Sequence, residues 1–436
     1  MDRYSRGELS KRIGLGLATI LAAVPIAVSA DTGSLTGARY LEVVEVKGES
    51  LPDIMGQTSE GYSVMAVSNG ALAPIPFQFD DLNKKGFIYV PGGSVEIDGE
   101  EGVFEAHDEL AFMYKDTGPQ ASAELLSAVS GEVIAEIELS DMGSNRYAYV
   151  LKGNSARSDI QYAKFNRETG LIETTMYSQK VDPDNLLIWE DYKYKTFAED
   201  RSLLDTMKLR VRAKLGPARA TITNKLIPNE IVGVKNAPVR SIIEMDASIA
   251  ILGIQLASAG ASVTVTENTL EFPVFLAIPT AAKVLQKNLA IEISLDFDQL
   301  EGSRIRTALG PTEPIITGSE DGIDPKQHNV SLEENWLSLS SGKGWDIIAF
   351  FERDEAFDPT LSLLYKDKGK GDKKDKPERV KGSDPQVGYI AKDIPVGIDS
   401  YLAINLYFGE DLWNGNQVEN AVKQITNPVP AKVKSL

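Results

Sequence analysis

The amino-acid sequence predicts an all-β protein: a large, mostly antiparallel β-sandwich of two or three packed units, with one short C-terminal helix. Runs of β-branched and aromatic residues recur at intervals of roughly ten to fifteen residues and end at Gly, Pro, Asn or Asp, as the strands of sandwiches do. Before residue 417 no long segment has the period of a helix. The sequence therefore argues against alternating strand–helix units and a Rossmann-type enzyme.

Residues 1–30 have the layout of a bacterial secretory signal peptide. A basic start is followed by an apolar run from Ile13 to Val28, and Val28-Ser29-Ala30 forms a small-x-small cleavage site. The run is shorter than the about twenty apolar residues that a spanning helix needs, and no later stretch is long and apolar enough. We expect cleavage after Ala30 and a periplasmic or secreted mature chain without a transmembrane helix.

Residues 31–152 are predicted to form an N-terminal β domain. Short β-rich runs, each ended by turn-forming residues, are its candidate strands. They cover Tyr40–Lys47, Gly61–Val67, Ile75–Phe79, Gly86–Val90, Glu109–Tyr114, Val133–Leu139 and Tyr147–Leu151.

Residues 153–300 are predicted to form a central β-sandwich region with longer strands. Apolar and basic residues alternate over Met207–Leu215, which predicts a strand with its apolar side chains inward and a basic row outward. The apolar segment Ala247–Val265 is expected to form two buried strands that turn at Ser258-Ala259-Gly260. Such long apolar strands indicate sheets that are covered on both faces.

Residues 301–436 are predicted to form a C-terminal β region. Apolar runs at Asp346–Phe351 and Tyr401–Phe408 predict core strands. Residues 366–381 are dense in Lys, Asp and Gly, which predicts a mobile loop. Binding of an anionic glycan or lipid by this loop is the alternative, and its interspersed acids weaken it. Gln417–Ile425 places its apolar residues on one face, which predicts the short helix.

Charge and composition exclude several classes of function. The 436 residues include 63 acidic and 45 basic side chains, and the formal net charge of −18 opposes broad binding to nucleic acid. The chain has no cysteine, which excludes disulfides, cysteine nucleophiles and thiolate metal sites. Its two histidines cannot form a three-histidine metal centre.

The acidic segment that starts at Asp80 is a candidate calcium site. Asp81, Asn83 and Gly86 have the spacing of an EF-type calcium loop, but Lys85 stands where such a loop has a ligand. Hard oxygen ligands from a later strand would complete a calcium site. The candidate ligands are Asp80, Asp81, Asn83, Asp108 and Glu109. The alternative is a turn in which Asp and Asn side chains bond the backbone of the same segment.

Residues 77–118 also loosely resemble uncharacterised secreted bacterial β-sandwich proteins. Those proteins carry an acidic Asp/Gly turn followed by an Asp-Glu-Leu-x-Phe-Met segment, here Asp108-Glu109-Leu110-Ala111-Phe112-Met113. The resemblance implies a secreted β-protein. It implies no known activity, so it transfers no catalytic residues.

Signals for an enzyme are sparse, and the sequence leans against one without deciding the question. His107 could serve as a base beside a Tyr or Arg, as in a polysaccharide lyase, but a histidine before Asp-Glu is more often a surface turn residue. A glycosidase needs two facing carboxylates, and the sequence cannot select a pair among 63 acids. The nucleophile elbow, the phosphate-binding glycine loop and the zinc-protease motif are all absent from the sequence.

Aromatic residues near polar loops are a candidate glycan-binding face. Sugars stack on flat aromatic rings while Asp and Asn side chains bind their hydroxyl groups. The candidate ligand-binding residues are Trp189, Tyr192, Tyr194 and Trp413. The alternative is that these aromatic side chains fill the core of the sandwich.

The leading functional hypothesis is an exported, non-enzymatic binding or accessory protein of the cell envelope, with carbohydrate as the candidate ligand. The first alternative is a carbohydrate-active enzyme, a polysaccharide lyase or glycosidase, on a β-sandwich scaffold. The second is a structural envelope component that binds another protein. The sequence does not name the ligand, and a fold alone does not assign a function.

Overall fold

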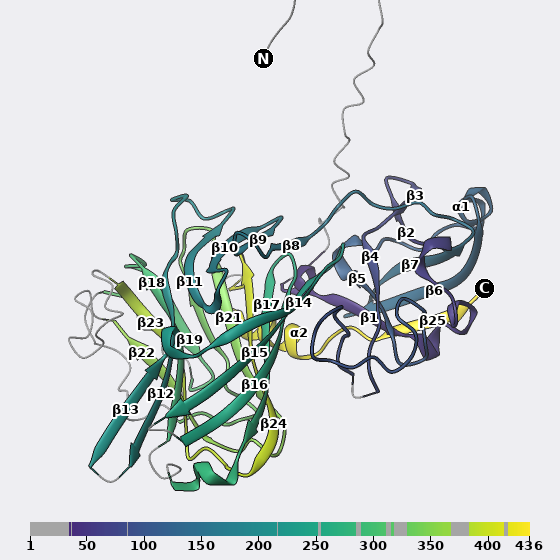
Figure 1. Ribbon diagram of the computed structural model, residues 1–436. Helices are drawn as coiled ribbons and strands as arrows, with labels where there is room; N and C mark the ends of the chain where they lie inside the picture. The colour runs from purple at the N-terminus through teal and green to yellow at the C-terminus, as the bar shows by residue number, and fades with distance from the viewer. Residues whose placement is uncertain are drawn as a thin grey trace, which may run out of the picture.

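The computed structural model describes residues 35, 37–84, 86–215, 217–251, 254–284, 289–310, 315–317, 329–367, 383–413 and 417–436. The predicted signal peptide, residues 1–30, and residues 368–381 of the predicted mobile loop lie outside the described residues. Figure 1 shows a smaller and a larger β lobe side by side. Strands dominate both lobes and pair in antiparallel fashion, which confirms the predicted all-β sandwich class.

The smaller lobe is a sandwich of two sheets with Val, Leu, Ile and Phe side chains packed between them. The three-stranded sheet has the order β1 (Val43–Lys47), β5 (Glu109–Met113), β4 (Phe77–Asp80). The five-stranded sheet has the order β25 (Ala431–Ser435), β6 (Glu132–Asp141), β7 (Ser144–Lys152), β2 (Tyr62–Ser68), β3 (Ala71–Pro74). The last strand of the chain, β25, therefore belongs to the lobe that the first strands build (Figure 1).

The larger lobe packs two long sheets around one apolar core. Its eight-stranded sheet has the order β14 (Asn229–Asn236), β15 (Ser241–Ile251), β16 (Ile254–Val265), β17 (Thr269–Ile278), β24 (Ile398–Gly409), β21 (Asp346–Arg353), β20 (Leu337–Ser340), β19 (Arg304–Thr307). Its five-stranded sheet has the order β13 (Ala218–Thr223), β12 (Leu204–Leu215), β18 (Ala290–Asp298), β23 (Ser383–Lys392), β22 (Thr360–Lys366). A four-stranded sheet has the order β11 (Asn185–Tyr194), β10 (Tyr177–Asp182), β9 (Leu171–Thr174), β8 (Ala163–Asn166).

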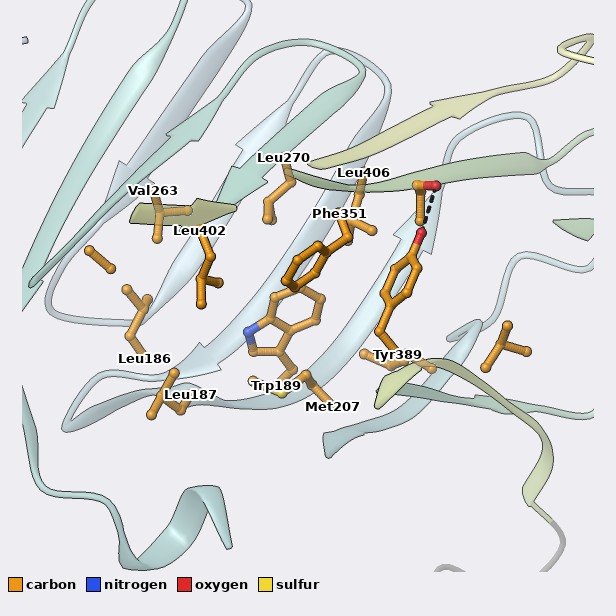
Figure 2. Close-up of a cluster of buried hydrophobic side chains, with 14 of the residues drawn as sticks. Leu186, Leu187, Trp189, Met207, Val263, Leu270, Phe351, Tyr389, Leu402 and Leu406 are labelled. Carbon is orange, nitrogen blue, oxygen red and sulfur yellow. Dashed lines mark hydrogen bonds between the residues drawn. The ribbon is translucent and has the colours of Figure 1, made fainter. Parts of the chain in front are cut away.

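Figure 2 shows part of this core, in which Trp189, Met207 and Phe351 pack against one another. The hydroxyl of Tyr389 donates a hydrogen bond to the backbone carbonyl of Ala349 at 2.9 Å, so its polar end is satisfied inside the apolar core. Tyr389 is thus a core aromatic residue whose polar group is paired.

The alternation of β24 gives the eight-stranded sheet one apolar and one polar face, because successive side chains of a strand point to opposite sides. Leu402, Ile404 and Leu406 face the core of the larger lobe. Tyr401 and Asn405 face the opposite side and line a cavity there. This polar face, which lies toward the smaller lobe, carries the candidate functional site.

The structure corrects two details of the central region. The predicted turn at Ser258-Ala259-Gly260 is wrong: β16 runs through these residues, and the hairpin instead closes where Ile251 pairs with Ile254. The predicted outward basic row of Met207–Leu215 is also wrong, since Lys208 is only 4% exposed. Acidic residues of the neighbouring strand β18 make its burial possible, because Lys208 pairs with Asp296 at 2.5 Å.

The predicted C-terminal helix is confirmed as α2 (Val418–Thr426), which buries Val418, Ala421 and Val422. A second helix, α1 (Ala123–Ala128), was not predicted, because six residues are too few to show a helical period. None of the described helices has the length and apolar character to cross a membrane.

Candidate functional site

Two adjoining hollows lie between the smaller lobe and the polar face of the eight-stranded sheet. The interlobe cavity has a volume of about 300 Å³ and includes Glu45 and Arg240 in its wall. The interlobe groove is more open, with a volume of about 640 Å³, and includes Phe87 and Phe275. Tyr401 lines both hollows, so the groove and the cavity adjoin at this residue.

Three neighbouring strands place polar side chains in the interlobe cavity. Glu271 on β17 is paired with Asn405 on β24, which is paired in turn with Phe350 on β21. Glu352 lies two residues further along β21 and lines the same cavity. The odd-numbered polar positions of β24 and the polar positions of its neighbours share one face because strand side chains alternate.

Several of these side chains have polar groups without a described hydrogen-bond partner. Among the described residues, no hydrogen bond or ion pair engages the side-chain carboxylates of Glu271 and Glu352 or the hydroxyls of Tyr401 and Tyr407. Asn405 is only 6% exposed, and its Oδ1 atom has no described hydrogen-bond partner. Buried polar atoms are nearly always paired, and an unpaired one costs free energy. Such a set of free polar groups around one cavity is what a polar ligand would satisfy.

Burial raises the pKa of Glu271 to about 7, and the negative charges of Glu45 and Glu352 add to the shift against the opposing charge of Arg240. Burial, together with Glu352 and Glu271, also raises the pKa of Tyr401 to about 12. The carboxyl of Glu271 therefore changes its protonation state near neutral pH, whereas the Tyr401 hydroxyl keeps its proton there.

Replacing Glu271 with glutamine is expected to stabilise the protein at pH 8 but not at pH 4. The folded pKa of about 7 lies above the unfolded value of about 4.3. The stability that the protonated carboxyl provides is thus present below about pH 4 and is lost as pH rises through about 7. We expect Glu271→Gln to be more stable than wild type by roughly 3 kcal/mol at pH 8 in urea unfolding, since each unit of pKa difference corresponds to about 1.4 kcal/mol. Equal differences at the two pH values would contradict the raised pKa.

A buried guanidinium fixes one wall of the interlobe cavity. Arg240, which precedes β15, is 4% exposed and pairs with Asp80 and Glu45 of the smaller lobe at 2.7 Å each. It also pairs with Glu109. The Oε1 atom of Gln78 accepts hydrogen bonds from the backbone N–H groups of residues 239 and 240 at 3.0 Å. These contacts hold the two lobes together beside the cavity.

A row of aromatic rings lines the interlobe groove. The Phe87 and Phe275 ring centroids are 4.4 Å apart, and those of Phe275 and Tyr401 are 5.4 Å apart. All three side chains are only partly buried. The acids Asp246 and Asp399 are exposed on the same groove. Phe87 comes from the smaller lobe and the other two rings from the larger one, so both lobes build the groove.

The predicted calcium ligands are engaged with the protein. Asp80 contacts Arg240 and Lys235, and these cations outweigh the effect of burial and lower its pKa. Asp108 accepts two backbone N–H groups, and Asp81 and Asn83 accept one each. The described residues contain no group of three or more His, Asp or Glu side chains arranged to hold a metal ion. Calcium binding stays a prediction, which a rise in the thermal unfolding midpoint with added calcium would support.

His107 lies in a turn at the edge of the smaller lobe, with its Nε2 atom 3.7 Å from Glu105 and 3.9 Å from Asp108. It is not among the residues that line the interlobe cavity or groove. The catalytic role considered for His107 therefore gains no support from its position.

The predicted ligand-binding aromatics are buried. Trp189 lines an apolar cavity of about 140 Å³ in the large core, and Tyr192 packs against Trp345. The hydroxyl of Tyr194 accepts a hydrogen bond from Asn268 at 2.8 Å, and the indole N–H of Trp413 donates to Ser338 at 2.6 Å. Each of the four is less than 8% exposed, so they offer no ring face to a ligand.

The sequence analysis missed the groups that line the interlobe hollows. A signal existed in each strand: Glu271 interrupts the apolar run of β17, and Asn405 stands alone among apolar neighbours in β24. A polar residue inside an otherwise apolar strand indicates a face with a special environment. The sequence could not show that these strands are adjacent.

Neither a scan against protein-family models nor a search of curated proteins finds a match to the chain. Among solved structures, the chain is similar to an α-mannosidase from Enterococcus faecalis V583, with 10% identity, a TM-score of 0.48, and coverage of 91% of this chain and 44% of that chain. The chain thus spans about half the length of that protein.

It is also similar to a galactose mutarotase related enzyme from Lactobacillus acidophilus, with 7% identity, a TM-score of 0.33, and coverage of 55% of this chain and 96% of that chain. An aldose epimerase homologue from C. elegans has 12% identity and a TM-score of 0.29, with coverage of 57% of this chain and 99% of that chain. Identities this low do not carry an activity from one protein to another.

Proposed function

We propose that this protein is an exported carbohydrate-binding protein of the cell envelope. It holds a glycan along the interlobe groove, with one end of the glycan in the interlobe cavity. The observation that carries the proposal is the combination of an aromatic row with free polar side chains in two hollows that share Tyr401.

The chemistry of a sugar matches both parts of this site. The apolar C–H face of a sugar ring stacks on the partly buried rings of Phe275 and Tyr401. Its hydroxyl groups donate hydrogen bonds to carboxylate and amide oxygens, which Glu271, Glu352 and Asn405 present in the cavity. A cavity of about 300 Å³ is within the usual size range of small-ligand sites.

Charge narrows the class of glycan. The acids Glu42, Glu45, Glu271 and Glu352 line the cavity, and Arg240 is the one basic residue among the described residues that line it. The groove adds exposed acids. Like charges on a ligand would be repelled. We therefore propose a neutral glycan, or one with amino groups, and not an anionic one.

Replacing Phe275 with alanine is expected to weaken glycan binding about thirtyfold, which corresponds to about 2 kcal/mol for truncation of a central aromatic contact. A panel of neutral oligosaccharides on an array identifies a ligand, and isothermal titration then compares the two proteins. Met142→Ala is the control, since Met142 is 90% exposed in a turn of the smaller lobe. Equal affinity of Phe275→Ala and wild type, or no binding to any neutral or amino-containing glycan, would contradict the proposal.

A further inference from the structure

We propose that the interlobe cavity hydrolyses a glycosidic bond of the glycan it holds, with Glu271 as the acid and Glu352 as the base. This inference rests on the proposed function, because its substrate is the glycan bound in the interlobe groove. The scissile bond lies beside Tyr401, where the groove meets the cavity.

The carboxylates of Glu271 and Glu352 are free of described partners, whereas several neighbouring acids are paired. Glu45 and Glu109, at the same lobe junction, are both paired with Arg240. Glu267, at the β16–β17 turn, is paired with Lys115. Among the described residues no such partner engages Glu271 or Glu352. The lobe junction thus pairs Glu45, Glu109 and Glu267 with cations and leaves Glu271 and Glu352 facing one cavity, where they are available for chemistry.

The spacing of Glu271 and Glu352 also fits a catalytic pair. Glu271 and Glu352 lie on strands separated only by β24, and their positions along the strands differ by two residues. Strand spacing and rise then place their Cα atoms about 12 Å apart. On β24, Asn405 lies beside Glu271 and Ala403 lies beside Glu352. The negative charge of Glu352 contributes to the raised pKa of Glu271, so the two carboxyls lie near enough to interact. Hydrolysis with inversion requires them at a separation of roughly 6.5–9.5 Å, which admits a water molecule.

The two carboxyls have different environments. Glu271 is partly buried at the centre of the sheet, and burial raises its pKa to about 7. Glu352 is exposed near the end of β21. An environment of this kind favours the protonated form of the more buried carboxyl, which assigns the acid to Glu271 and leaves Glu352 as the base.

The reaction consumes one water molecule. The carboxyl proton of Glu271 passes to the glycosidic oxygen as the bond from that oxygen to the anomeric carbon breaks. A water molecule on the opposite face attacks the anomeric carbon and gives its proton to the Glu352 carboxylate. The products are two sugar chains, one with a new reducing end. Asn405, whose Oδ1 atom is unpaired, accepts a hydroxyl of the sugar and positions it.

The test incubates the purified full chain with a panel of neutral polysaccharides, namely β-glucan, mannan, xylan and galactan, and measures new reducing ends. We expect wild type to release them from at least one polysaccharide. Glu271→Gln and Glu352→Gln are expected to lose the rate by at least about a hundredfold while keeping affinity for the intact chain, since general acid–base groups contribute about 10²–10⁴-fold. Glu190→Gln on β11, outside the cavity, is the control and keeps the wild-type rate.

The outcomes separate the two proposals. Binding without any new reducing ends would overturn the hydrolysis and leave the carbohydrate-binding function standing. A wild-type rate in Glu271→Gln would overturn the assignment of the acid. Absence of both binding and release would overturn both proposals. Circular dichroism of each variant shows that a lost rate is not a lost fold.

Discussion

Arg240→Met is expected to lower the free energy of unfolding by about 3 kcal/mol. The substitution leaves Asp80 and Glu109, which are 0% and 3% exposed, without the guanidinium that both contact. Breaking a buried ion pair from one side costs about 3–5 kcal/mol, because a charge stays buried without its partner. Lys235 and Lys47 still contact these acids, so we expect the lower end of that range. Urea unfolding followed by tryptophan fluorescence measures the loss.

Arg353→Met is the matched control for this prediction. Arg353 pairs at 3.6 and 3.7 Å with Glu333 and Asp358, whose side chains are 81% and 73% exposed. Exposed pairs contribute at most about 1 kcal/mol. The folded-state pKa of Asp80 is lowered, so its contribution is present above the unfolded value of about 3.9 and is lost on acidification. The cost of Arg240→Met should therefore shrink below about pH 4, and equal costs for the two variants at pH 7 would contradict this account.

Trp345→Ala is expected to lower the free energy of unfolding by about 3–5 kcal/mol, the usual cost of truncating a buried aromatic residue. Trp345 is 0% exposed, and its ring lies 5.5 Å from that of Phe297 and 6.1 Å from that of Tyr192. Its indole N–H donates to the Tyr192 hydroxyl at 3.4 Å. The substitution removes both the apolar contacts and this hydrogen bond. Chemical unfolding measures the change.

The glycan affinity of the same variant shows whether the aromatic residues around Trp345 belong to the core or to the binding site. Trp345→Phe is the control and should lose less stability, because a phenyl ring still fills part of the space that the Trp345 side chain occupies in the core. Under conditions where Trp345→Ala remains folded, its affinity for a glycan should equal that of wild type, since Trp345 and Tyr192 face the core. Loss of binding with unchanged stability would indicate that the ligand binds at the aromatic residues around Tyr192 and not in the interlobe hollows.

The strands and the C-terminal helix could be predicted because their signals are local. The alternation along β12 and the apolar face of α2 are read within ten residues or so. Whether a face of a strand is buried or exposed depends on residues that are distant in the sequence. Lys208 was assigned to solvent because nothing near it in sequence shows that β18 would supply Asp296 as its partner.

The candidate site could not be predicted because it depends on strand order. Glu271 and Glu352 meet only because β24, far along the chain from β17, inserts between β17 and β21. The sequence predicts a site in which aromatic rings and acidic side chains bind the ligand, and residues of both kinds line the interlobe groove. Their positions differ from the prediction, since aromatic content gives no sign of whether a ring such as Trp189 fills the core or Phe275 borders solvent.

Hydrogen–deuterium exchange with and without a bound neutral oligosaccharide tests most directly whether the interlobe groove and the interlobe cavity form the glycan site. We predict slower exchange on binding in three segments, around Phe87, in β17 and in β24, and no change around Trp189. Protection confined to β11 or to the turn at His107, with none in β17 and β24, would contradict the central claim.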